Sequence, residues 1–328
     1  MTHKSNDLIG LGNALMDFLV EVDDHKLLEF NLKKGEMHLV EEEKAKEILH
    51  KINHYQLKIE TLPGGSAANT LRAFAFLGGK AILCGKVGKD KHGEMYVQEM
   101  NKQGVQTRIN NHTKNTGHAV TFITPDSQRT FSVHLGAALE LYKEDILEED
   151  IQKSKILHIE GYQIEGQTKE TVLQAIQLAQ KNNTLISLDL ADPGVIRRNK
   201  SFLKELVAKV DIIFLNEEEA KEYTGLQPEE AAKDLGRYVK TVVVKRGAQG
   251  SLIYHHHTLT KIGVFPAKAI DTTGAGDCYA AGFLYGYCQG WELEKAGKLG
   301  SLLASRIVEQ KGVAIGKLNA TEIKSKLL

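Results

Sequence analysis

The sequence has no net charge, few cysteines and no long apolar run. Lys+Arg and Asp+Glu each number 42 in 328 residues, so no overall field attracts a nucleic-acid backbone or an acidic membrane surface. The three cysteines, Cys84, Cys278 and Cys288, form no CxxC pair, which predicts free thiols in a reducing compartment and neither disulfides nor a zinc site. The least polar stretch, 278–288, is too short to span a bilayer, and the first residues lack a signal-peptide pattern. We expect a cytoplasmic protein that binds no nucleic acid and no membrane.

Several common catalytic motifs are also missing. The sequence contains neither GxxxxGK[ST] nor HExxH, and the glycines at 10 and 12 do not continue to GxGxxG. The segment 64–68, GGSAA, lacks the final glycine of a nucleophile elbow. These absences disfavour a P-loop ATPase, a Rossmann dehydrogenase, a zincin and an α/β-hydrolase. The triplet 255–257, HHH, follows a strand-like run and is predicted to be a loop tip rather than a metal site.

Short apolar runs alternate with helical patterns along most of the chain. Because the runs lack polar alternation, they suit strands that are covered on both faces. Between them, segment 168–181 places Val172, Ile176 and Ala179 on one helical stripe. Alternating strands and helices predict an α/β fold in which a mainly parallel sheet lies between two helical layers. The six apolar runs are 8–12, 81–85, 156–159, 185–190, 211–215 and 241–244.

Two stretches depart from this pattern. Segments 17–40 and 117–136 alternate more nearly between apolar and polar residues, which suits half-exposed antiparallel strands. Since both stretches follow predicted strands, we expect them to form a small β-sheet lid over the site. No Gly/Ser linker or internal repeat divides the chain. We therefore expect one domain over residues 1–328, with lid segments at about 14–45 and 116–136.

The strongest chemical signal is DTTGAGD at residues 271–277, followed by a helical run. Gly274, Ala275 and Gly276 leave backbone N–H groups uncovered where the helix begins, and these donors and the helix dipole form an anion site that suits a phosphate. Asp277 would accept the proton of an attacking hydroxyl, and phosphoryl transfer needs little more than positioning and charge neutralisation. The alternative is that Asp277 only caps the helix and the glycines only shape a turn.

A second glycine motif, PGGSAAN, occupies residues 63–69 and opens a predicted helix. Ser66 could cap that helix, while Asn69, three residues later, would point towards the same space as the bare backbone of Gly64 and Gly65. Polyol hydroxyls could pair with these groups. After the first strand, Asn13 and Asp17 offer an amide and a carboxylate that could fix a ribose or another sugar. The candidate polyol-binding residues are therefore Asn13, Asp17, Gly64, Gly65, Ser66 and Asn69.

With these motifs in place, the chain resembles the ribokinase-like, PfkB-type carbohydrate and nucleoside kinases over essentially its full length. Segments 64–79 and 85–93 are similar to the N-terminal signature of that family, and 271–277 is similar to its C-terminal signature. The resemblance implies a three-layer ribokinase-like α/β sandwich with a β-sheet lid. It also implies ATP-dependent phosphorylation of a primary hydroxyl on a small molecule.

Within the family, the sequence is most similar to the adenosine kinase branch at 12–17, 32–37 and 127–130. This likeness implies a nucleoside 5′-hydroxyl as the acceptor. It also implies that Arg129 reaches from the lid to the phosphates. One departure is Gly194, because that branch tends to offer an aromatic residue after the Asp-Pro pair at 192–193. By similarity, the base would be lined by Leu15, Met37, Leu39 and Tyr162.

The resemblance also assigns residues to ATP and to metal ions. Asn216 and Glu219 are similar to the family's NxxE element, which helps to organise Mg²⁺ through water, although the segment 217–219 could simply be an acidic first helical turn. The segment 245–250 resembles the loop beside the ATP phosphates, and a tight turn after a strand is an equal alternative. Potassium could act near 271–273. The implied cofactor-binding residues are Asn216, Glu219, Lys245, Gly247, Gly250, Thr272 and Thr273.

Three functions therefore compete. An adenosine kinase-like enzyme is favoured, a ribokinase- or fructokinase-like sugar kinase would use the same glycines and Asp277, and a catalytically silent sensor could keep the fold without turnover. The intact 271–277 heptad disfavours the sensor. An exposed lid edge could pair with another chain or stay free, so the sequence allows either a monomer or a homodimer.

Overall fold

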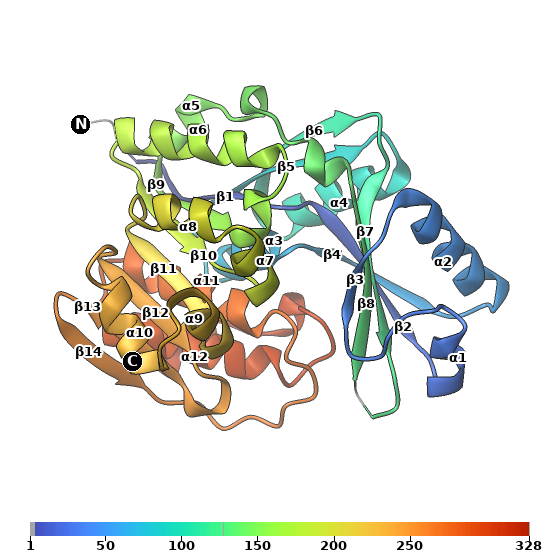
Figure 1. Cartoon of the computed structure of the whole chain (residues 1–328). Helices are drawn as coiled ribbons and strands as arrows, with labels where there is room; N and C mark the ends of the chain where they lie inside the picture. Colours follow the sequence, from blue (N-terminus) through green and yellow to red (C-terminus); the bar gives the residue numbers. More distant parts are fainter. Residues whose placement is uncertain (1–3, 127, 328) are drawn as a thin grey trace.

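A nine-stranded sheet forms the centre of the computed structural model, which describes residues 4–126 and 128–327 (Figure 1). Its strand order is β14-β13-β12-β11-β10-β9-β1-β5-β6, and all neighbours pair in parallel except β12–β13 and β13–β14. The mainly parallel sheet is confirmed. The strands are β1 (Asn6–Leu11), β5 (Ala81–Gly88), β6 (Val105–His112), β9 (Ser154–Glu160), β10 (Leu185–Asp189), β11 (Ile212–Asn216), β12 (Thr241–Lys245), β13 (Ser251–His255) and β14 (Thr258–Ile262).

Two hydrophobic cores cover the two faces of this sheet, as the apolar runs require. Successive strand residues alternate between the cores: Leu8 belongs to one and Ile9 to the other. The first core contains α3 (Ser66–Phe76), α4 (Lys91–Lys102), α11 (Ala275–Cys288), α12 (Leu293–Ile307) and α13 (Ala320–Ser325). The second contains α5 (Glu148–Gln152), α6 (Thr168–Lys181), α7 (Pro193–Arg198), α8 (Lys200–Val207), α9 (Glu217–Thr224) and α10 (Pro228–Leu235). This three-layer α/β arrangement confirms the predicted fold class.

The second sheet has the strand order β3-β8-β7-β2-β4 and stands beside the main body as the lid (Figure 1). The expectation of antiparallel pairing was wrong for two pairs, since β2–β7 and β3–β8 are parallel, while β2–β4 and β7–β8 are antiparallel. One strand, β4, comes from outside the two expected segments. The lid strands are β2 (Leu15–Glu21), β3 (Met37–Leu39), β4 (Ile59–Gly64), β7 (Thr116–Ile123) and β8 (Arg129–Gly136).

The lid sheet is covered on its outer face, so its alternating pattern does not mean solvent on one side. Met16, Phe18 and Val20 of β2 belong to the first core, together with Ile48 and Ile52 of α2. The intervening residues of β2 face a cavity instead. The alternation of residue types along β2 therefore distinguishes the face that packs against the first core from the face that lines the cavity. The lid region also contains α1 (Asp24–Leu28) and α2 (Glu42–His54).

The remaining elements are short. His256 and His257 form the turn between β13 and β14, both with positive φ, so the predicted loop tip is confirmed. Cys84, Cys278 and Cys288 are free thiols. In the part of the chain that the structure describes, no helix combines the length and apolar character needed to cross a membrane. The 3₁₀ turns are η1 (Ala137–Glu140), η2 (Lys143–Asp145), η3 (Gly161–Ile164), η4 (Gly247–Gln249) and η5 (Ile315–Lys317).

Candidate active site

Two adjoining cavities lie where the carboxyl ends of the central strands meet the lid and α11. The first, here called the lid cavity, has a volume of about 220 Å³ and is bounded by β2, β3, β7 and β8. The second, the α11 cavity, has a volume of about 760 Å³ and lies between the ends of β10–β12 and the start of α11. Ser66 and Tyr162 line both cavities, so the two spaces meet at these residues.

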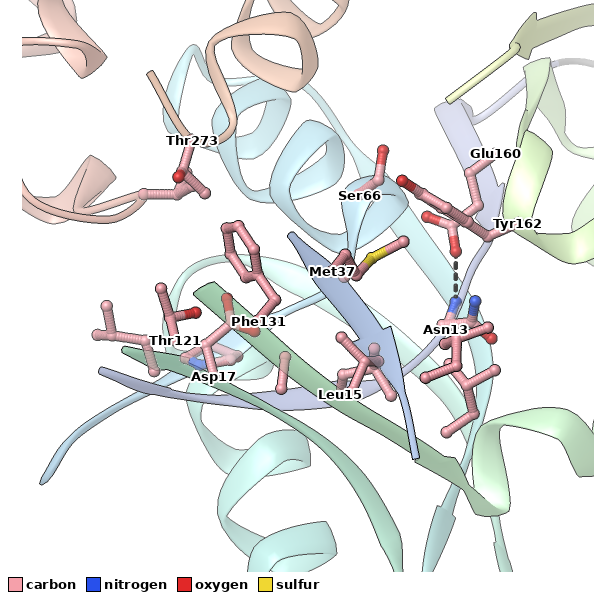
Figure 2. A pocket seen from close by; sticks show the side chains of 18 of the residues that line it. Asn13, Leu15, Asp17, Met37, Ser66, Thr121, Phe131, Glu160, Tyr162 and Thr273 are labelled. Atoms are coloured by element: carbon pink, nitrogen blue, oxygen red, sulfur yellow. Dashed lines mark hydrogen bonds between the residues drawn. The ribbon is translucent and has the colours of Figure 1, made fainter. Parts of the chain in front are cut away.

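Most of the predicted acceptor-binding residues surround the lid cavity (Figure 2). Gly64 and Asn69 are the exceptions, because neither lines it. Two residues predicted for other roles, Arg129 and Thr273, do line it. The structure therefore brings together residues from β1, the lid, the start of α3 and η3. The predicted acceptor-binding residues that line the cavity are Asn13, Leu15, Asp17, Met37, Leu39, Gly65, Ser66 and Tyr162.

The two glycines before α3 let the backbone approach the polar end of this cavity. A Cβ at Gly64 would overlap the carboxylate of Asp17, and a Cβ at Gly65 would overlap the carbonyl oxygen of Asn13. Gly65 also has φ +95°, a backbone conformation that strongly favours glycine. Gly64 thus acts by leaving room for Asp17 rather than by lining the cavity.

We predict that Gly64→Ala weakens acceptor binding. The new methyl group must displace the carboxylate of Asp17 from the lid cavity, so we expect the KM for the acceptor to rise about tenfold or more, while the KM for ATP stays within about twofold. Gly316→Ala is the matched control, because a Cβ there meets no atom within 4 Å. Unchanged acceptor KM in Gly64→Ala would contradict this account of the glycine.

Glu160, at the end of β9, is a site residue that the sequence reasoning missed. Its carboxylate accepts the backbone N–H of Asn13 at 2.8 Å, drawn in Figure 2, and that of Ala67 at 2.6 Å. Burial raises the pKa of Glu160 to about 7, although these two N–H groups lower it. Gln163 donates to Asn13 Oδ1 at 2.8 Å. Glu160 therefore ties the end of β1 to the first turn of α3. The only signal in the sequence was an acidic residue directly after an apolar run.

Asp277 lies in the first turn of α11 and meets the start of α3. Ser66 Oγ donates to one carboxylate oxygen at 2.8 Å, and Asn69 Nδ2 donates to the other at 3.0 Å. The N-cap of α11 is Gly274, in the left-handed region at φ 70°, so Asp277 does not cap that helix. Ser66 does not cap α3 either: Gly65 takes that position, and the hydroxyl of Ser66 is directed to Asp277.

The start of α11 also provides unpaired backbone donors. Within residues 4–126 and 128–327, the N–H groups of Gly276 and Asp277 donate to no protein acceptor, whereas the N–H of Ala275 bonds to Thr272 O at 3.2 Å. Ala275, Gly276 and Asp277 line the α11 cavity. Free N–H groups at a helix start, with the dipole behind them, form an anion site. Gly274 is not among the cavity-lining residues; its left-handed conformation turns the chain into the helix.

Burial raises the pKa of Asp277 to about 6, although the hydrogen bonds from Asn69 and Ser66 lower it. In its predicted role as general base, Asp277 must be ionised, so its protonation is expected to remove activity as the pH falls through about 6. We predict that kcat/KM is level near about pH 8 and falls about tenfold per pH unit below about pH 6. Steady-state assays across this range test it, and a rate independent of pH down to about pH 5 would contradict the role of Asp277.

A lysine and two carboxylates line the α11 cavity close to the start of α11. Lys245 Nζ donates to Asp189 Oδ2 at 2.7 Å, and a Cβ at Gly276 would lie 3.1 Å from the same ammonium. Burial lowers the pKa of Lys245, but the negative charges of Asp189 and Glu219 raise it by more than burial lowers it. The pKa of Lys245 therefore lies above its usual value. The ammonium thus stays charged beside the anion site. Sequence reasoning identified Lys245 and Glu219 but not Asp189.

Asn216 and Glu219 form a reciprocal cap at the start of α9. Glu219 N donates to Asn216 Oδ1 at 2.9 Å, and Asn216 N donates to Glu219 Oε2 at 2.8 Å. Both residues line the α11 cavity. Burial raises the pKa of Glu219 to about 7. No group of three or more His, Cys, Asp or Glu side chains among the described residues could hold a metal ion directly.

Arg129 connects the lid to the turn before α11. It pairs with Asp271, and only 12% of the Arg129 side chain and 1% of the Asp271 side chain are exposed. Asp271 also accepts the N–H of Thr273 at 2.9 Å and that of Gly312 at 2.5 Å. Asp271 thus ties the lid and the segment at 312 to the turn before α11. A potassium site near 271–273 stays a prediction. Arg129 lines the lid cavity, not the α11 cavity.

The other predicted nucleotide residues divide between the cavities. Thr272, Gly247 and Gly250 line the α11 cavity, and Thr273 lines the lid cavity. Gly247 and Gly250 also have positive φ, as a tight turn after β12 requires. The same turn forms part of the wall of the α11 cavity, so the two alternatives given for this segment do not exclude each other. Sequence reasoning missed the apolar wall of this cavity because it comes from an irregular segment. That wall includes Val264, Phe265, Pro266, Ala267 and Ala269.

Position 194 lies outside both cavities. In its place, Arg198 of α7 lines the lid cavity, where it pairs with Glu165 at 2.8 and 3.1 Å. A Cβ at Gly194 would lie 2.7 Å from Asp192 Oδ1 and 3.1 Å from Arg198 Nη1. The glycine therefore leaves space for this guanidinium. Neither Arg198 nor Glu165 was identified from the sequence.

The start of α11 offers an anion site, and the Asp277 carboxylate beside it contacts Ser66, where the two cavities meet. This arrangement is typical of a phosphotransferase that acts on an alcohol. The chain belongs to the pfkB family of carbohydrate kinases, whose profile matches residues 30–320.

Known relatives of the chain include kinases of different acceptors. A 5-dehydro-2-deoxygluconokinase from Clostridium perfringens is 33% identical over 264 residues, which cover 75% of this chain and 78% of the relative. A probable sugar kinase from Rhizobium etli CFN 42 superposes with a TM-score of 0.90 at 29% identity, covering all of both chains. The adenosine kinase from Sinorhizobium meliloti superposes with a TM-score of 0.89 at 30% identity, covering 98% of this chain and 99% of that one.

Proposed function

We propose that this protein transfers the γ-phosphoryl group of ATP to the 5′-hydroxyl of a nucleoside, as a cytoplasmic adenosine kinase-like enzyme. The observation that carries the proposal is the composition of the lid cavity. Apolar side chains, mostly from the lid strands, form one part of its wall, while polar and charged groups, among them Asn13, Asp17 and Arg129, line the rest. A flat nucleobase suits such a wall, and the polar end suits a ribose, whereas a sugar alone would leave the apolar part unfilled. The apolar lining residues include Leu15, Leu19, Met37, Leu39, Phe131, Val133, Leu135 and Leu139.

ATP occupies the α11 cavity in this proposal. The apolar segment around Phe265 and Pro266 receives its base, and the terminal phosphate lies at the start of α11. Mg²⁺ neutralises phosphate charge when bound, and Asn216 and Glu219 hold it through water. The large cavity, the free N–H groups and Lys245 all fit an anionic nucleotide.

The reaction then follows from the meeting of the two cavities. Asp277 accepts the proton of the 5′-hydroxyl, the acceptor oxygen bonds to the γ-phosphorus, and the bond to the β-phosphate oxygen breaks, leaving ADP. The N–H groups of Gly276 and Asp277 stabilise the charge on the transferred group. Ser66 and Asn69 hold the carboxylate of Asp277 in place for the acceptor.

A sugar acceptor is the second candidate, because the relative from Clostridium perfringens, which is 33% identical to this chain, is named as the kinase of a sugar acid. The two candidates differ in whether the acceptor carries a base. ADP release measured with adenosine, inosine, cytidine, ribose, fructose and 5-dehydro-2-deoxygluconate separates them. We expect the highest kcat/KM with a nucleoside, and a rise in melting temperature with adenosine but not with ribose or fructose. A higher kcat/KM with any sugar than with every nucleoside would overturn the nucleoside proposal.

A further inference from the structure

Arg72, in the middle of α3, is a buried cation that also lines the lid cavity. The residue is 2% exposed, and burial lowers the pKa of its guanidinium. Among the described residues, no carboxylate lies within ion-pair distance of it. An unpaired charge inside a protein costs free energy unless hydrogen bonds compensate it. A buried arginine without a contacting counter-ion therefore needs an explanation other than a simple ion pair.

The donors of Arg72 reach four acceptors from four parts of the chain. Nε donates to Gln103 Oε1 at 2.7 Å and Nη2 donates to Val313 O at 2.9 Å. Nη1 donates both to Pro63 O at 2.7 Å and to Asn69 Oδ1 at 3.2 Å. Three of these contacts tie α3 to other segments: Pro63 lies at the end of β4, Gln103 lies at the end of α4, and Val313 lies in the segment after α12. The fourth contact leads to the catalytic carboxylate.

The contact with Asn69 fixes the direction of an amide. A guanidinium can only donate hydrogen bonds, so the oxygen of the Asn69 side chain must face Arg72. The amide nitrogen then faces Asp277, to which it donates at 3.0 Å. Without Arg72, the amide could rotate and turn its oxygen towards the carboxylate, an unfavourable contact between two acceptors. Arg72, Asn69 and Asp277 thus form a chain of hydrogen bonds with one allowed orientation.

We infer that Arg72 is a positioning residue for catalysis, which acts through Asn69 to hold the carboxylate of Asp277 in the orientation that receives the acceptor proton. The inference rests on the proposed reaction at Asp277 but not on the identity of the acceptor. Although Arg72 lines the lid cavity, each of its three nitrogens already donates to a protein acceptor. We therefore expect it to serve the chemical step more than substrate binding. The loss of its contact should therefore lower kcat and leave the KM values nearly unchanged.

The test compares Arg72→Met, Arg72→Lys, Asn69→Leu and the double variant Arg72→Met/Asn69→Leu with the wild type. Each is assayed with whichever acceptor gives the wild type its highest turnover. We expect Arg72→Met to lower kcat by about 10- to 100-fold, with KM values within about threefold. Arg72→Lys should restore part of the loss, because an ammonium can donate to Asn69. The double variant should lose no more activity than Asn69→Leu alone, since both changes break one chain of contacts.

Gln103→Leu is the matched control, because it removes another partner of Arg72 and leaves the contact with Asn69 intact. Its kcat should stay within about twofold of the wild type. The inference would be overturned if Arg72→Met kept the wild-type kcat, or if Gln103→Leu lost as much kcat as Arg72→Met. It would also be overturned if the fold-losses in kcat of the two single variants multiplied in the double variant. If Arg72→Met does not fold, Arg72→Lys combined with Asn69→Leu supplies the same test of additivity. Absence of turnover in the wild type with every acceptor would instead count against the proposed function.

Discussion

Replacement of Asp277 by asparagine is expected to lower kcat by about 10³-fold or more, because the variant keeps the shape of the side chain but cannot take the acceptor proton. Asparagine still offers an oxygen to Ser66 or Asn69, so the contacts between α3 and α11 should be largely retained. Binding of ATP and of the acceptor should change little. The measurement is ADP release under saturating substrates, together with the melting temperature and its shift on ligand binding.

Asp234→Asn is the control for this change. Asp234 lies in α10, where it pairs with Arg237 on the surface and lines neither cavity. Its kcat should equal that of the wild type. If Asp277→Asn turned over at a rate close to wild type, the proton acceptor would have to be another group. If it lost activity because it no longer folded, its melting temperature would show that directly.

Lys245→Met is expected to lower kcat/KM for ATP by about 10²-fold, since it removes the cation beside the free N–H groups of α11.

The same variant should also have a lower melting temperature. Asp189 and Glu219 are 4% and 2% exposed, and loss of their shared cation leaves buried negative charge that costs about 3 kcal/mol of folding free energy. Protonation of Glu219, whose pKa burial raises to about 7, should limit this cost at low pH. Steady-state kinetics and thermal unfolding measure the two effects.

Lys240→Met provides the matched control, because Lys240 pairs with Asp211 on the surface just before β12, with 66% of its side chain exposed. An exposed pair contributes little to stability, so neither kinetics nor melting temperature should change measurably. The two lysines lie five positions apart, so general effects of removing a positive charge should be similar in both variants. Equal kcat/KM for ATP in Lys245→Met and wild type would show that the phosphates do not lie beside this residue.

The architecture could be predicted where the sequence pattern is set by burial on both faces of a strand. The run at 211–215 corresponds to β11, whose residues alternate between the two cores. The edge strand β6 could not be predicted in the same way, because its sequence VQTRINNH is largely polar and half-exposed. The lid strand β4 contains Pro63, which is allowed at the edge of a sheet but weakens the strand pattern.

The candidate site could be located from the sequence where glycine turns mark it, as at 64–65 and 274–276. Residues that act through contacts between distant segments could not. Glu160 contacts Asn13, 147 positions away, and Asp189 accepts a hydrogen bond from Lys245, 56 positions away. Nothing in the sequence around Arg72 distinguishes it from an exposed helical arginine. These roles arise only when the fold brings the end of β1, the start of α3 and the start of α11 to one place.

A crystal structure with Mg²⁺, a non-hydrolysable ATP analogue and the acceptor of highest turnover would show where the start of α11 and Asp277 lie relative to the reacting groups. We expect oxygens of the γ-phosphate within about 3 Å of the backbone nitrogens of Gly276 and Asp277, and the acceptor hydroxyl within about 3 Å of the Asp277 carboxylate. A γ-phosphate bound away from the start of α11, or an acceptor hydroxyl beyond the reach of Asp277, would contradict this expectation.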